Sequence, residues 1–74
     1  MKTTANHATV SILLNGEGRQ VPPGSVVDLL AFLDIDPRTV VVEINREIVR
    51  RPGMETTYIK ESDEIELVHF VGGG

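Results

Sequence analysis

The residues best suited to chemistry in this sequence are the last four, Val71-Gly72-Gly73-Gly74. A glycine-rich end is often only a disordered terminus, because glycine loses more backbone entropy on ordering than any other residue. Two features favour a function instead. The predicted strand at 65–71 runs into the glycines without a polar spacer, and the final group is an α-carboxylate with no bulky side chain beside it. Such a carboxylate can be threaded into a narrow active site of another protein.

Other residue types with chemical potential give weaker signals. His69 has no Ser, Cys or acid at a spacing diagnostic of catalysis, so we interpret it as an edge or partner-facing side chain. The pair Arg50-Arg51 has no glycine-rich loop beside it, which favours a solvated turn over a phosphate site. The sequence shows no convincing nucleophile, metal cluster or phosphate loop. We therefore predict no catalytic residue, no metal site and no bound cofactor.

The composition is that of one small acidic domain. At 74 residues the chain is near the lower limit for folding without disulfides or metal, and it contains no cysteine, which excludes thiolate chemistry. The formal net charge of −4 argues against nucleic acid as a partner and is compatible with docking onto a basic protein surface. No apolar run approaches the roughly 20 residues that span a bilayer, and residues 1–8 lack the apolar stretch of a secretory signal. We expect a cytoplasmic protein that binds no membrane.

The first part of the chain predicts a β-hairpin that leads into a helix. Residues 9–14 show the alternation of a half-buried strand, Asn15-Gly16 favours a tight turn, and a short return strand is expected near 19–21. Ser25 and Asp28 have the spacing of a capping box at a helix N-terminus. An apolar stripe continues the helix through Val26, Leu29, Leu30 and Leu33, and Asp36-Pro37 is expected to end it.

The second part of the chain predicts three more strands. They are expected at 39–44, at 47–49 after the turn Asn45-Arg46, and at 64–71 after the polar turn 60–63. Between them, 50–53 breaks the pattern and 54–59 is expected to be a loop with one helical turn at most. Within that loop, Tyr58 and Ile59 are expected to cap the core.

These elements predict an α+β fold, in which a mixed sheet of four or five strands is covered on one face by a single helix. The first and last strands can both be central if they lie side by side in parallel, which places the tail at one end of the sheet. Residues 1–8 are expected to be a disordered extension, 9–71 the folded domain, and 72–74 a flexible tail.

Strand alternation also predicts an apolar patch on the uncovered face of the sheet. If the neighbouring residues point to the helix, Leu13, Val41, Val68 and Phe70 point outward, close to the tail. An exposed apolar patch of this kind usually marks an interaction site. The alternative is a register shifted by one residue, which would move all four side chains into the core.

Four stretches of the sequence occur in a characteristic combination. They are Asn15-Gly16-Glu17, Val26-Val27-Asp28-Leu29-Leu30, Val42-Glu43-Ile44-Asn45 followed by Glu47-Ile48-Val49, and the segment from Ile65 to Gly74 that ends in VHFVGGG. Over residues 10–74 this combination resembles the ThiS family, the small sulfur carriers of bacterial thiamine biosynthesis. The resemblance implies the β-grasp fold, which is shared with ubiquitin.

The resemblance also implies a reaction sequence. An adenylyltransferase related to ubiquitin-activating enzymes would use ATP to adenylate the carboxylate of Gly74. Sulfur from a cysteine desulfurase would then replace AMP to give a thiocarboxylate, from which thiazole synthase takes the sulfur. Gly72 and Gly73 would thread through the partner active sites, because they can pass where a Cβ atom would clash. The carrier would be a cosubstrate and not an enzyme.

The sequence departs from the family pattern at three places, and two alternatives stay open. Ser62 stands where a Gly is common before the last strand, Met54 stands where an aromatic residue is common, and residues 1–8 have no counterpart.

The alternative functions are the small subunit of molybdopterin synthase, which would purify with a stable partner, and a ubiquitin-like modifier, which would give covalent ladders on denaturing gels.

Overall fold

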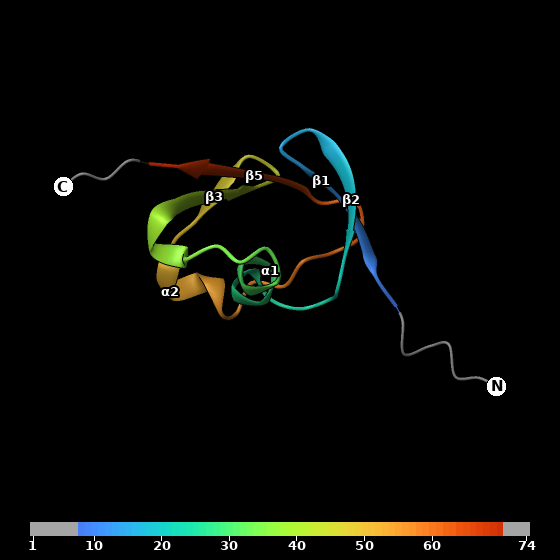
Figure 1. Cartoon of the computed structure of the whole chain (residues 1–74), viewed down its shortest axis with the longest axis horizontal. Helices are drawn as coiled ribbons and strands as arrows, with labels where there is room; N and C mark the ends of the chain where they lie inside the picture. Colours follow the sequence, from blue (N-terminus) through green and yellow to red (C-terminus); the bar gives the residue numbers. More distant parts are fainter. Residues whose placement is uncertain (1–7, 71–74) are drawn as a thin grey trace.

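The computed structural model describes residues 8–70, which form a five-stranded mixed sheet with one main helix against one face (Figure 1). The strand order is β2-β1-β5-β3-β4. The elements are β1 (Val10–Leu14), β2 (Glu17–Val21), α1 (Val26–Phe32), η2 (Pro37–Thr39), β3 (Val40–Ile44), β4 (Glu47–Val49), α2 (Arg51–Met54) and β5 (Glu64–His69). The predicted α+β class and helix-covered mixed sheet are confirmed.

The hairpin of β1 and β2 forms as predicted, but β2 is longer than the sequence indicated. Asn15 and Gly16 have φ values of 49° and 85°, the positive values required by a two-residue turn that follows the twist of the strands. β2 begins at Glu17, not near residue 19, and pairs with β1 along its whole length. Its first four residues are exposed and carry no apolar alternation, so the sequence pattern could not show them as a strand.

The predicted capping box opens α1. The Asp28 N–H donates to Ser25 Oγ at 3.2 Å, and the Ser25 N–H donates to Asp28 Oδ2 at 2.9 Å. Two amides of the first turn are thereby satisfied. The expected stripe faces the sheet, with Val26, Leu29 and Leu30 buried and Leu33 partly buried.

The helix ends at Phe32, four residues before the predicted end at Asp36. The cause is Asp34, whose φ of 61° turns the chain out of the helix. The Ile35 N–H donates to the Leu30 carbonyl at 2.9 Å, and the Asp34 N–H donates at 3.1 Å to the carbonyl three residues earlier. These two bonds are those of a Schellman motif, with aspartate at the position where glycine is usual.

A second correction concerns the segment after β4. The one helical turn is α2 at Arg51–Met54, where the sequence predicted a break, because Pro52 is favourable in the first turn of a helix. Met54 is buried and fills the core. Ile59 is buried as expected, but Tyr58 is 61% exposed and does not cap the core.

β5 occupies the centre of the sheet, as predicted for the last strand. It pairs in parallel with β1, where Leu13 lies beside Glu64, and antiparallel with β3, where Val40 lies beside His69. The observed strand ends at His69, two residues before the predicted end at residue 71, which itself lies outside the described residues. The core lies between this sheet and α1, and among residues 8–70 it contains twelve buried apolar residues, including Ile65 and Leu67 of β5.

Ser62 occupies the turn that leads into β5 and has a φ of 71°. A residue with a Cβ atom loses about 1–2 kcal/mol in the left-handed region relative to glycine, so serine is less favourable here than the glycine common in the family. The Ser62 N–H donates to the Ser11 carbonyl at 2.7 Å, so the turn is attached to the start of β1.

Candidate functional site

The candidate site is the end of β5, where the chain leaves the sheet. Figure 1 shows β5 running past the β1–β2 hairpin toward the C-terminal end of the chain. The last described residue is Phe70, whose N–H donates to the Thr39 carbonyl at 3.2 Å. The predicted threading residues Gly72 and Gly73 and the predicted acceptor of AMP and sulfur, Gly74, lie outside the described residues.

Asn15 holds β5 from the hairpin side. Its N–H donates to the Ile65 carbonyl at 2.9 Å, and its Oδ1 accepts the Leu67 N–H at 2.8 Å. The positive φ of Asn15 turns the backbone away from β5, so the side chain takes the position of the next backbone carbonyl of β1. The pairing of β1 with β5 ends at Ile65, and the side chain of Asn15 extends the hydrogen bonding to Leu67, two residues further along β5.

Asn45 holds the other side of β5, at its start. The Asn45 N–H donates to the Glu64 carbonyl at 2.7 Å, and Asn45 Oδ1 accepts the Glu64 N–H at 3.0 Å. Asn45 Nδ2 donates to Asp63 Oδ1 at 3.0 Å, while Asp63 Oδ2 accepts the Lys60 N–H at 2.8 Å. Sequence reasoning interpreted Asn15 and Asn45 as turn formers only. The available signal was the ability of asparagine to bond backbone groups from a turn.

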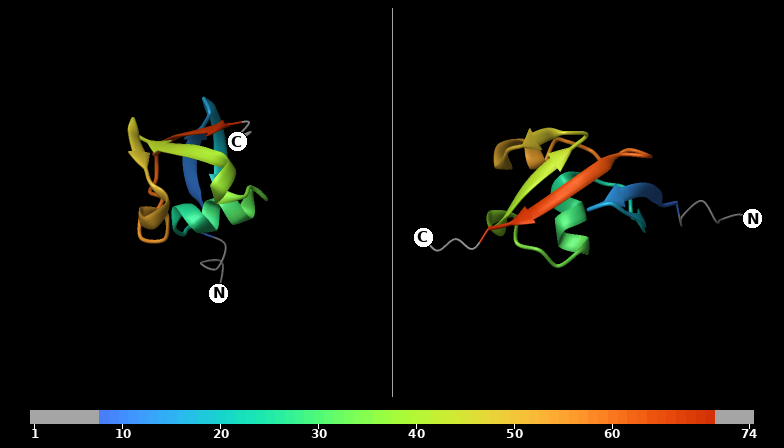
Figure 2. Two further views of the ribbon diagram at one scale, coloured as in Figure 1. Left: turned by 90° about the vertical axis from the view of Figure 1, so that its left-hand side faces the viewer. Right: turned by 90° about the horizontal axis from the view of Figure 1, so that it is seen from above.

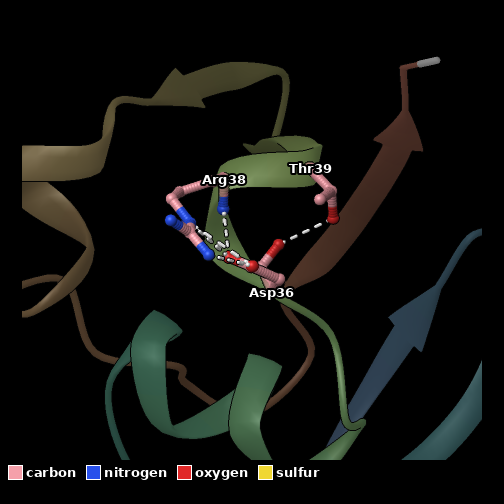
Figure 3. A network of polar contacts seen from close by, with 3 residues as sticks. All are labelled: Asp36, Arg38 and Thr39. Carbon is pink, nitrogen blue, oxygen red and sulfur yellow. Dashed lines mark hydrogen bonds and ion pairs between the residues drawn. The ribbon is translucent and has the colours of Figure 1, made fainter. Parts of the chain in front are cut away.

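The turn η2 contacts the end of β5 from the β3 side through Thr39, and a network of polar contacts stabilises this turn (Figure 3). Arg38 Nη2 lies 2.7 Å from Asp36 Oδ2, and the Thr39 hydroxyl donates to the Asp36 carbonyl at 2.7 Å. Hydrogen bonds from the side chain and backbone of Arg38 lower the pKa of Asp36 to about 2, and the same contact raises the pKa of Arg38. The network fixes the Thr39 carbonyl that receives the Phe70 N–H.

The four residues of the predicted patch are all exposed: Leu13 at 42%, Val41 at 37%, Val68 at 53% and Phe70 at 50%. The predicted register is confirmed in this respect. Val41 and Val68 are paired across β3 and β5, and Phe70 follows two residues later on the same face. We call Val41, Val68 and Phe70 the tail-proximal patch. Leu13 pairs with Glu64, about 13 Å back along β5, so it lies apart from the other three.

Acidic side chains adjoin the tail-proximal patch. Glu43 and Glu66 stand directly opposite each other on the same face of β3 and β5. Like charges in this position destabilise a sheet. Within residues 8–70, the ion pair at 4.0 Å or less joins Asp36 and Arg38, so neither glutamate has a cation within that distance there.

Within the described part of the chain, no group of three or more His, Cys, Asp or Glu side chains could hold a metal ion. His69 is exposed at the end of β5. Between residues 8 and 70, no helix is long and apolar enough to cross a bilayer. The described geometry provides a strand that Asn15 holds from the hairpin side and that Asn45 and Thr39 hold from the β3 side, and this strand presents an apolar and acidic surface.

Comparison with known proteins gives a consistent result. The model of the ThiS family matches residues 12–74, which include Gly74. A sulfur carrier protein ThiS of Bacillus subtilis is 41% identical over 51 residues, which cover 69% of this chain and 77% of that protein. A crystal structure of the thiamine biosynthesis protein ThiS of Geobacter metallireducens superposes with a TM-score of 0.76 at 30% identity, covering 88% of this chain and all of that one.

A second kind of relative is much longer. A thiazole synthase of Magnetococcus marinus is 39% identical over 66 residues, which cover 88% of this chain. The chain spans only 20% of the length of that protein. The matching segment is thus a small part of a larger protein.

Proposed function

This chain belongs to the ThiS family, and from this premise we propose that it is a sulfur carrier of thiamine biosynthesis that works through the carboxylate of Gly74. The observation that carries the proposal is the family match, which extends through Gly74 and includes the strand that Asn15 holds by a hydrogen bond at Leu67. The name of the Bacillus subtilis relative supports sulfur carriage over the two alternative functions, the molybdopterin synthase subunit and the protein modifier.

The proposed chemistry begins with activation of the carboxylate. A carboxylate is a poor electrophile, because its negative charge repels nucleophiles and its oxygen is a poor leaving group. Attack of the Gly74 carboxylate on the α-phosphorus of ATP would release pyrophosphate and give a mixed anhydride with AMP. The partner adenylyltransferase would bind the ATP and hold the two reacting groups in line.

Sulfur transfer would follow at the same carbon. The persulfide of a cysteine desulfurase would attack the activated carbonyl and displace AMP, and a thiol would then cleave the sulfur–sulfur bond to leave the thiocarboxylate. Thiazole synthase would accept this sulfur. The long thiazole synthase relatives support that partner, because a carrier-like segment occurs within them. In this scheme the carrier is a cosubstrate, and its dependence on ATP fits a cytoplasmic location.

The test of this function is an intact-mass measurement. We expect the full chain, incubated with ATP, the adenylyltransferase, a cysteine desulfurase and cysteine, to gain about 16 Da, the difference between sulfur and oxygen. Samples without ATP or without the adenylyltransferase are the controls. A chain that stays unmodified in the complete mixture, while a known carrier is converted in the same mixture, would contradict the proposal.

We further propose that the tail-proximal patch docks the adenylyltransferase. Val68→Ser should raise the KM for the carrier by roughly tenfold, because a buried valine contributes about 1.5 kcal/mol or more, while kcat stays unchanged. The measurement is ATP–pyrophosphate exchange at varied carrier concentration. Phe32→Ser is the control, because Phe32 is 52% exposed at the end of α1, which covers the opposite face of the sheet. Equal effects of the two substitutions on KM would show that the tail-proximal patch does not bind the adenylyltransferase.

A further inference from the structure

The end of β5 has backbone groups that the sheet does not use. Hydrogen bonds from Asn45 to Glu64 and from Phe70 to Thr39 show that even-numbered residues of β5 point their backbone groups toward β3. In an antiparallel pair the intervening residues point the other way. The N–H and C=O groups of Ile65, Leu67 and His69 therefore face the hairpin side.

Only part of that side is covered. β1 ends at Leu14, and Asn15 takes the Ile65 carbonyl and the Leu67 N–H. Within residues 8–70, the Leu67 carbonyl and both backbone groups of His69 have no hydrogen-bond partner on this side. Figure 2 shows, in its right-hand view, the end of β5 running beyond the hairpin with β3 along its other side. These three groups form a short free edge at residues 67–69.

The side chains beside this edge indicate what kind of strand it accepts. Glu66 and Val68 lie two residues apart on the uncovered face of β5, next to Glu43 and Val41 of β3. A strand added beside residues 67–69 at the usual spacing of about 4.8 Å would place its own alternate side chains beside Val68 and Phe70, because Asn15 already lies beside Glu66. A long basic side chain suits the first position, because it can reach Glu66 along the diagonal and the two opposed glutamates have no cation near them in the described residues. An apolar side chain suits the second.

We propose that an extended segment of the adenylyltransferase pairs with β5 at residues 67–69 as an added strand, with a basic side chain beside Val68 that reaches Glu66 and an apolar side chain two positions away beside Phe70. The inference rests on the proposed function, because it assigns the partner from it. Backbone pairing of this kind supplies affinity, and the side chains supply specificity. Pairing at this position also fixes the direction in which β5 delivers the residues that follow it.

Amide exchange tests the proposal directly. In the free ¹⁵N-labelled full chain we expect the His69 amide to exchange quickly and the Val68 amide, which points to β3, to exchange slowly. Addition of the purified adenylyltransferase should slow exchange at His69 by at least roughly tenfold, because it gains a hydrogen bond. An unchanged His69 amide in a complex that still supports ATP–pyrophosphate exchange would overturn the proposal and leave the proposed function intact.

A pair of substitutions at His69 separates the backbone from the side chain. His69→Pro removes the N–H and should weaken binding of the adenylyltransferase by roughly tenfold, with little change in melting temperature, because that N–H is unused in the fold. His69→Ala keeps the N–H and should bind within about twofold of the original chain. Equal losses for the two variants would overturn the proposal. Protection of His69 that rises with carrier concentration alone would show pairing with a second copy, and would also overturn it.

Discussion

Removal of Gly74 is expected to abolish adenylation while leaving the fold unchanged. The shortened chain still ends in a glycyl carboxylate, but this carboxylate lies one residue closer to the folded domain, about 3.5 Å short of the position that a fixed docking surface sets. Displacements of this size are large compared with the tolerance of a reacting pair. ATP–pyrophosphate exchange and intact mass should both show no modification. If the truncated chain is adenylated normally, the distance between the docking surface and the carboxylate does not determine whether the carboxylate reacts.

Alanine at Gly73 should be nearly as damaging, although the length is unchanged. A misfit of about 1.4 kcal/mol already costs a factor of ten in rate, and a Cβ atom in a narrow channel costs more than that. We expect exchange to fall well over tenfold for Gly73→Ala and for Gly74→Ala. Gly18→Ala is the matched control, because a Cβ atom added at Gly18 meets no atom within 4 Å. If the tail variants exchange more slowly than Gly18→Ala while all three have the same melting temperature, the loss of activity comes from the tail and not from the fold.

Much of the fold could be predicted because its signals are local. Alternation at Val10, Ile12 and Leu14 shows a strand with one buried face, and Ser25 with Asp28 shows where the helix begins. The predictions failed where the residue types give no recognisable signal. β2 is a strand because β1 pairs with it, and its own exposed residues give no pattern. The helix ends at Phe32 because Asp34 adopts a backbone conformation for which glycine is the usual signal.

The chemistry of the candidate site could be predicted from the sequence, but the contacts that hold β5 in place could not. The glycine tail and the outward residues Val41, Val68 and Phe70 follow from the sequence and the strand period. The contact between Asn15 and Leu67 joins residues 52 positions apart, and no periodicity shows it. The separation of Leu13 from the other patch residues depends on the offset between β1 and β5, which hydrophobic alternation leaves undetermined.

The largest loss of stability at a polar position is expected from Asp63→Ala. Asp63 is only 5% exposed, and its carboxylate accepts bonds from the Lys60 N–H and from Asn45 Nδ2. Alanine would leave both donors without their partner, at a cost of about 2–3 kcal/mol in the free energy of unfolding. For a domain of this size the melting temperature should fall by roughly 10–20 °C. Thermal denaturation followed by circular dichroism measures this change.

Asp63→Asn separates the two bonds, because it keeps one acceptor and replaces the other with a donor. Its carbonyl oxygen can still accept the Lys60 N–H, but its amide group would then face Asn45 Nδ2. Asn45 cannot relieve the conflict by turning its amide, because its Oδ1 accepts the Glu64 N–H at the start of β5. The loss should therefore lie between zero and that of Asp63→Ala, at about 1–2 kcal/mol. If Asp63→Asn is as stable as the original chain, the bond from Asn45 Nδ2 to Asp63 contributes nothing, and the other hydrogen bonds of Asn45 hold the start of β5.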